Sequence, residues 1–197
     1  MNATFIVLIA LIISSCAGIT GGGNQEWKEQ VILPNGQELI VGRSQTLGSR
    51  FEREFSAFNA PLGPTSYAVS LPGLNGQAVK WEGEHKDQVP IAVALNHGTA
   101  YLVAIPSCRT YVNMGRPSPP FLVFRHSGVS WETTTIADFP FEITEANLLI
   151  GTDSQRISNV QDDGLISAKA IRRLNEGNAM RRVYRQGTDR YLWAGCG

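Results

Sequence analysis

Hydrophobic and polar residues alternate in eight short runs. The runs form four pairs, and the two runs of each pair are separated by a short stretch that contains Gly, in most cases with Pro or Asn. Alternation with a period of two is typical of strands with one buried face, and a short turn between two such runs predicts a β-hairpin. The pattern predicts four hairpins, whose paired runs are Trp27–Leu33 with Glu38–Val41, Ser66–Leu71 with Gln77–Glu82, Val89–Leu95 with Thr99–Ile105, and Phe121–His126 with Val129–Ile136.

The first hairpin carries the clearest local signal. Asn35 and Gly36 lie in its turn, and both residues tolerate the positive φ angles of a type I′ turn. Centred on this pair, Val31 is expected to face Ile40, and Ile32 to face Leu39. Both faces would then be partly apolar, so we expect this hairpin to be covered on both sides.

The third hairpin and the stretches between the hairpins carry weaker signals. His97 is interpreted as a turn residue with an unusual φ angle. Phe51, Phe55 and Phe58 have helical spacing and predict a short helix that contributes to the core. The segment 106–120 is expected to be irregular, with an extended proline-rich end, and Asn147–Ile150 is a candidate short strand.

One helix is predicted near the C-terminus, from Ala168 to Asn175, with Ser167 as its N-cap and Ile171 and Leu174 as its apolar contacts. The predicted fold is therefore mainly β. We expect a single antiparallel β-sandwich or partly open barrel in residues 26–197, with a short C-terminal helix and a cleaved signal peptide before it.

The N-terminal stretch Phe5–Ile13 contains nine apolar residues, too few to span a bilayer and typical of the apolar region of a signal peptide. The following Ile13-Ser14-Ser15-Cys16 resembles the lipobox of bacterial lipoproteins. This resemblance implies cleavage after residue 15 and lipidation of Cys16. Residues 16–25 would then form a flexible tether. The competing interpretation is a buried apolar strand or helix.

Charge and cysteine content narrow the choice of partners. The chain has 17 basic and 17 acidic residues, a balance that does not favour nucleic acid as a partner. Cys108 and Cys196 could form a disulfide in an oxidising compartment, or remain two unpaired thiols. They lack the spacing of a zinc site, so the sequence predicts neither a metal nor a cofactor.

Motifs of common hydrolases and nucleotide-binding proteins do not occur in the sequence. It contains no Gly-x-Ser-x-Gly, Ser-x-x-Lys or His-Glu-x-x-His string and no phosphate-binding glycine motif. The acidic residues Glu82, Glu84 and Asp87 with His85 are a conceivable cation or acid–base site, but a solvated strand edge is the favoured interpretation.

A thiol nucleophile is the second catalytic hypothesis. Cys108 could act with His97 or His126 as its base. No local signature supports that arrangement, and the disulfide is favoured over it.

The proline-rich loop offers a candidate partner-binding surface. Tyr111, Met114, Arg116 and Phe121 combine aromatic, flexible apolar and guanidinium groups, a composition favoured at protein interfaces. The competing interpretation is a loop that folds over its own sheet.

Several fragments together resemble an uncharacterised family of small exported proteins and lipoproteins of Gram-negative bacteria. They are Glu26-Trp27-Lys28-Glu29-Gln30-Val31, Leu33-Pro34-Asn35-Gly36, Gly115-Arg116-Pro117-Ser118-Pro119-Pro120 with Phe121-Leu122-Val123-Phe124, Trp131, and Phe139-Pro140. The resemblance implies an envelope location and a β-rich fold, and it supplies no catalytic residue.

Two functional hypotheses follow. The first is a non-enzymatic envelope lipoprotein that is attached to a membrane through lipid on Cys16 and that binds or braces another envelope protein. By resemblance to enteric sorting, Ala17 after the lipidated cysteine favours the outer membrane, facing the periplasm. The alternative is a periplasmic hydrolase acting on cell-wall or exported substrates.

Overall fold

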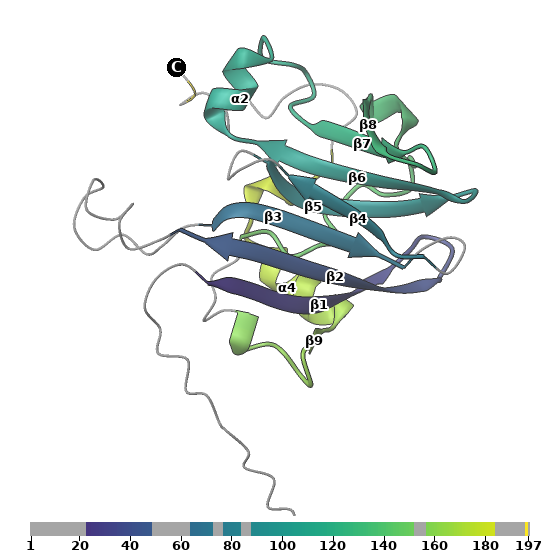
Figure 1. Cartoon of the computed structure of the whole chain (residues 1–197), viewed down its shortest axis with the longest axis vertical. Coiled ribbons are helices and arrows are strands. Elements are labelled where there is room, and N and C mark those ends of the chain that lie inside the picture. Colours follow the sequence, from purple (N-terminus) through teal and green to yellow (C-terminus); the bar gives the residue numbers. More distant parts are fainter. Residues whose placement is uncertain are drawn as a thin grey trace, which may run out of the picture.

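The computed structural model describes residues 23–48, 64–72, 77–83, 88–151, 157–183 and 196. Strands dominate, and they form two separate sheets (Figure 1). The first sheet contains β1 (Asn24–Ile32), β2 (Glu38–Leu47), β3 (Pro64–Leu71), β4 (Val79–Gly83) and β9 (Leu165–Ile166), in the order β4-β3-β2-β1-β9.

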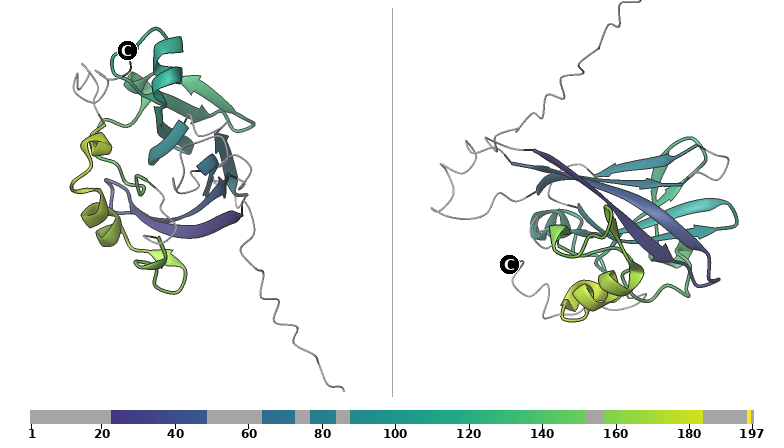
Figure 2. Two further views of the ribbon diagram at one scale, coloured as in Figure 1. Left: turned by 90° about the vertical axis from the view of Figure 1, so that its left-hand side faces the viewer. Right: turned by 90° about the horizontal axis from the view of Figure 1, so that it is seen from below.

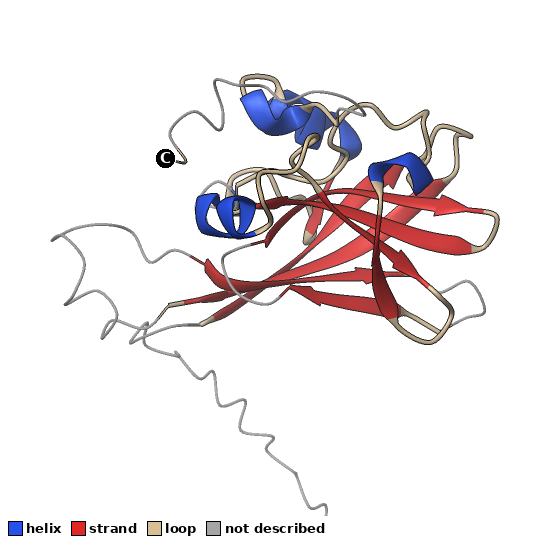
Figure 3. Cartoon of the chain, turned by 90° about the horizontal axis from the view of Figure 1, so that it is seen from above, coloured by secondary structure: helices blue, strands red, loops and turns tan. Residues whose placement is uncertain are grey.

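The second sheet contains β5 (Gln88–Asn96), β6 (Thr99–Pro106), β7 (Leu122–His126) and β8 (Trp131–Thr134), in chain order. The helical segments are α2 (Cys108–Asn113), α4 (Ala168–Asn175) and the 3₁₀ turns η1 (Ile136–Asp138) and η2 (Ala179–Arg181). They lie along one side of the strands (Figure 3).

The predicted mainly β fold and its four hairpins are confirmed. β1 pairs with β2, β3 with β4, β5 with β6 and β7 with β8, all antiparallel. Neighbouring hairpins also pair through β2 with β3 and β6 with β7. The strands of the first sheet are visibly twisted (Figure 2). A hydrogen bond joins the two sheets at β8 and β4, where the indole Nε1 of Trp131 donates to the carbonyl of Lys80 at 2.8 Å.

The predicted register of the first hairpin is wrong by one residue. Val31 faces Leu39, not Ile40, and Ile32 faces Glu38. The loop spans three residues: the Gly36 amide donates to the Leu33 carbonyl at 2.9 Å, and only Gly36 of the loop has a positive φ, 81°. Pro34 fixes its own φ near −65°, which suits a type I turn followed by a left-handed glycine.

As a consequence, this hairpin is not covered on both sides as predicted. Ile32 and Ile40 are 50% and 44% exposed.

Alternation along the strands places one apolar layer between the sheets. It includes Val31, Val41, Val69, Trp81, Leu102 and Leu122. The second sheet is buried on its other face as well, where Phe139, Ile143 and Ile150 pack on Val103 and Val123. The predicted helix Ala168–Asn175 and its Ser167 cap are confirmed, with Ser167 Oγ accepting from the Ala170 amide at 3.3 Å.

The candidate strand Asn147–Ile150 is not a strand. It runs beside the edge of β5, where the Asn147 side chain accepts from the Val93 amide at 2.9 Å and donates to the Val93 carbonyl at 2.8 Å. The Leu148 amide donates to the Ile91 carbonyl at 3.0 Å. A side-chain amide therefore replaces the backbone groups that a regular strand would use.

Candidate functional site

An open groove lies between the first hairpin and the segment 142–147, and its volume is about 390 Å³. Three apolar residues, Leu33, Ile143 and Ile171, line it and are almost fully buried. Its border carries Ile32, Glu142 and Arg172, all exposed. An adjoining hollow of about 310 Å³ shares Leu33, Pro34, Glu142 and Ile143 with it. Apolar groups with a polar border are typical of binding surfaces.

One wall of the groove is the outer edge of β1. β9 is only two residues long, and it pairs with Lys28 and Glu29 of β1. After Ile166 the chain turns into α4, and Gln30 Oε1 accepts from the Ala168 amide at 3.2 Å. In the part of the chain that the structure describes, no strand pairs with the outer edge of β1 beyond Glu29.

The opposite wall is held in place by backbone hydrogen bonds. The Ala146 amide donates to the Arg181 carbonyl at 2.6 Å, and the Val183 amide donates to the Thr144 carbonyl at 2.9 Å. The next residue, Asn147, is attached to β5 through Val93. Both walls are therefore anchored to strands or to paired backbone, so the groove is formed before anything binds.

The groove lining contains acidic residues that form no ion pair with any residue that the structure describes. Glu142 and Glu145 line it and are exposed, and Arg172 is the basic residue of its lining. Among the described residues, the ion pairs are Arg43–Glu29, Lys80–Glu82 and Arg125–Glu132, and none of them involves a side chain of the groove. The ionisable residues of the groove lining therefore carry one more negative than positive charge.

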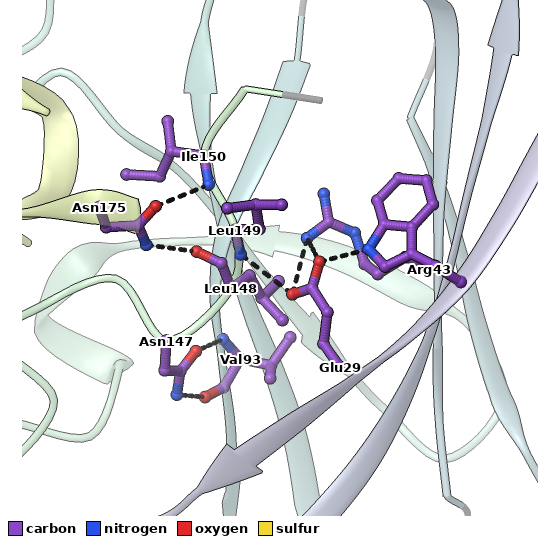
Figure 4. Close-up of polar contacts among 9 residues, drawn as sticks. Glu29, Arg43, Val93, Asn147, Leu148, Leu149, Ile150 and Asn175 are labelled. Atoms are coloured by element: carbon purple, nitrogen blue, oxygen red, sulfur yellow. Dashed lines mark hydrogen bonds and ion pairs between the residues drawn. The ribbon is translucent and has the colours of Figure 1, made fainter. Parts of the chain in front are cut away.

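A second polar cluster lies inside the fold (Figure 4). Glu29 on β1 accepts from Trp27 Nε1 at 2.6 Å, from Arg43 Nη1 at 3.2 and 3.3 Å, and from the Leu149 amide at 3.0 Å. The guanidinium carbon of Arg43 lies 5.3 Å from the centre of the Trp27 ring. The side chains of Glu29 and Arg43 have no exposed area, so solvent and substrates do not reach the carboxylate.

This cluster attaches the segment 148–150 to both the first sheet and α4. Asn175 Oδ1 accepts from the Ile150 amide at 3.0 Å, and its Nδ2 donates to the Leu148 carbonyl at 2.8 Å. Together with Glu29, these contacts satisfy buried backbone groups on a segment that is not itself a strand. The buried charges therefore have a structural role.

The predicted disulfide between Cys108 and Cys196 is confirmed. The hypothesis of a Cys108 nucleophile with His97 or His126 is therefore wrong, since a disulfide sulfur is not a thiolate. His97 lies in the β5–β6 turn with a φ of 46°, as expected for a turn residue.

The predicted partner loop is only partly irregular. Its first half forms α2, because Ser107 caps the helix by accepting from the Thr110 amide at 3.2 Å, so the expectation of an irregular segment from residue 106 is wrong there. Tyr111 is buried, Phe121 is half-buried, and Met114 and Arg116 are exposed. Its role in binding a partner stays a prediction.

Other predicted site residues lie apart from the groove or outside the described residues. Glu82 is exposed and pairs with Lys80, while Glu84, His85 and Asp87 lie outside the described residues. Cys16 and the phenylalanines 51, 55 and 58 are also outside them. Within the described ranges, no group of three His, Cys, Asp or Glu residues is placed to hold a metal ion.

Sequence reasoning did not find the groove. Its walls come from residues more than 100 positions apart, such as Ile32 and Glu142.

No protein-family model, curated protein or solved structure matches this chain. Among the described helices, none is long and apolar enough to cross a membrane.

Proposed function

We propose that this protein is an exported lipoprotein of the bacterial envelope, anchored through lipid on Cys16, and that its β domain binds another envelope component. The observation that carries the binding role is the preformed groove between β1 and the segment 142–147, with its buried apolar residues and exposed border. A binding module needs such a concave surface, and no reaction needs to take place in it.

Two features support the location. The lipobox-like Ile13-Ser14-Ser15-Cys16 supplies the anchor, and Ala17 favours the outer membrane facing the periplasm. The Cys108–Cys196 disulfide is of the kind that persists in oxidising compartments such as the periplasm. Two or three lipid chains on the first mature residue would hold the domain firmly at a membrane surface.

The anchor is tested by intact mass and membrane fractionation in a Gram-negative host. The natural chain should begin at a lipid-modified Cys16 and sediment with membranes, and Cys16→Ala should abolish the lipid mass and release the protein. A chain that keeps residues 1–15, or membrane attachment that survives Cys16→Ala, would show that the lipoprotein proposal is wrong.

The binding role is tested by photo-crosslinking in cells. A benzophenone amino acid at the position of Ile32 should give one discrete adduct, whereas the same group at Val129, which is 92% exposed on the β7–β8 turn, should not. The crosslinked molecule, once identified and purified, should bind the protein in vitro, and Ile32→Lys should weaken that binding. Equal adducts from both positions would count against the groove as the binding surface.

A further inference from the structure

We propose that the groove binds an extended, cationic polypeptide segment, which pairs as an additional strand with the outer edge of β1. This inference rests on the proposed function only in taking the groove as the binding surface. It assigns the chemical class of the partner and the manner of its binding.

The first argument concerns the direction of the backbone groups in β1. The Leu33 amide donates to Gln37 of the hairpin, so odd-numbered residues of β1 point their backbone groups toward β2. The Lys28 amide donates the opposite way, to the Gly164 carbonyl at 3.1 Å. By the alternation of a strand, the backbone groups of Gln30 and Ile32 also point away from β2. The parallel pairing of Glu29 with Ile166 takes the Gln30 amide, so the Gln30 carbonyl and the backbone groups of Ile32 are the ones that face the groove.

An exposed strand edge of this kind is a template for another strand. β9 pairs with this edge at Lys28 and Glu29 and thereby takes the Gln30 amide as well, whereas β1 continues to Ile32. Peptides that bind by strand addition gain affinity from main-chain hydrogen bonds and specificity from pockets for alternate side chains. The buried residues Leu33, Ile143 and Ile171 provide an apolar surface for such a side chain.

Charge selects the kind of peptide. Glu142 and Glu145 stand on the wall opposite β1, and neither forms an ion pair within the described part of the chain. Arg172 opposes them in the lining, and Arg182, outside the lining, is the antiparallel bridge partner of Glu145. A strand that alternates apolar residues with Lys or Arg would place its side chains against both the apolar surface and the carboxylates. An acidic strand would be repelled.

The test uses the full chain purified in detergent and a displayed pool of random heptapeptides. Selection should enrich sequences that alternate β-branched residues with Lys or Arg. The leading peptide, made with a fluorescent label, should bind about threefold to tenfold more weakly to Glu142→Gln/Glu145→Gln at low salt, since each exposed charge pair contributes only modestly to affinity. Glu132→Gln on β8 is the matched control and should leave the affinity unchanged.

Strand addition has its own readout. Two versions of the peptide are made, one methylated on its odd-numbered amides and one on its even-numbered amides. Methylation removes hydrogen-bond donors without changing side chains, so the version that loses the donors facing β1 should lose binding, and the other should keep it. Unfolding midpoints of all variants should match the parent, which separates loss of binding from loss of fold.

Three results would overturn the inference: no enrichment over the Glu142→Lys/Glu145→Lys variant, enrichment of acidic peptides, or equal binding of both methylated forms. Dimers of this chain joined through Cys substituted at Ile32 would also overturn it, by assigning the edge to a second copy. A glycan or lipid captured from Ile32 in cells would overturn it too, yet leave the proposed binding function intact. Failure of Cys16 lipidation affects only the proposed location.

Discussion

The buried ion pair between Glu29 and Arg43 gives the sharpest test of how the fold is held together. Glu29→Leu removes the acceptor for Trp27 Nε1 and for the Leu149 amide, and it leaves the Arg43 guanidinium buried without its counter-ion. Removal of one partner of a buried pair costs about 3 to 5 kcal/mol. We expect Glu29→Leu to lie at the upper end of this range.

Replacement of the other partner, Arg43→Leu, should lower the free energy of unfolding by less, because Glu29 and Arg43 differ in how many of their hydrogen-bonding groups have partners. In Arg43→Leu the Glu29 carboxylate still accepts from Trp27 and from Leu149. In contrast, Nε and Nη2 of Arg43 have no hydrogen-bond partner among the described residues even in the parent protein. The double variant Glu29→Leu/Arg43→Leu should therefore be more stable than Glu29→Leu alone, since apolar residues of suitable volume replace buried ion pairs at little cost.

The measurement is urea unfolding followed by tryptophan fluorescence at pH 7, with the disulfide intact. With a slope of about 1 to 3 kcal/mol per molar urea, a loss of about 4 kcal/mol lowers the midpoint by at least about 1 M. Glu82→Gln breaks the exposed pair with Lys80 on β4 and should change the free energy of unfolding by less than about 1 kcal/mol. Additive effects of the two single substitutions, or a change below about 1 kcal/mol for Glu29→Leu, would refute this reasoning.

Three further predictions concern other parts of the fold. Gly83→Ala should destabilise the protein by about 1 to 3 kcal/mol in urea, because its Cβ would lie 2.5 Å from the Trp81 ring, whereas Gly177→Ala, with nothing within 4 Å, should be neutral. Asn175→Ala leaves the Ile150 amide and the Leu148 carbonyl unsatisfied, so thermal unfolding should show a loss of about 2 to 4 kcal/mol, and a loss below about 1 would contradict the role of this side chain. Hydrogen bonds from Thr134 and then Thr135 lower the pKa of Asp138 below the ordinary 3.8, so its stabilising contribution is present above about pH 4 and is lost as the pH falls. The destabilisation caused by Asp138→Asn should therefore be larger at pH 6 than at pH 2, and an equal difference at both pH values would contradict this.

Local signals in the sequence predicted the hairpins and the helix. Asn35 and Gly36 mark a turn wherever they stand between two strands, and Ser167 caps α4 through contacts within one helical turn. The register failed by one residue because Pro34 changes the turn type, and a change of one position alters which side chains face each other.

Long-range features could not be predicted from the sequence. Nothing near Leu165 indicates a parallel pairing with Lys28, and nothing near Asn147 indicates that its side chain would pair with the backbone of Val93. The groove depends on both features, because β9 ends early on β1 and Asn147 holds the opposite wall. A site made by such contacts has no local pattern.

The position of β1 within its sheet has a consequence for the order of folding. β1 is the first described strand in the chain, yet it lies inside the sheet between β2 and β9, and β9 begins only at Leu165. The Glu29 side chain accepts a hydrogen bond from the Leu149 amide, 120 residues later in the chain. The Gln30 side chain accepts one from the Ala168 amide, 138 residues later. Contacts this distant in sequence slow folding, because a long loop must close before they form.

During synthesis from the N-terminus, β1 is therefore made early, but its contacts with β9, Leu149 and Ala168 can form only late. During that interval its outer edge and the carboxylate of Glu29 lack the partners that later residues supply. A chain truncated after β8, at Thr134, would have the same incomplete β1 permanently, with all four hairpins present but neither β9 nor α4 to close the sheet.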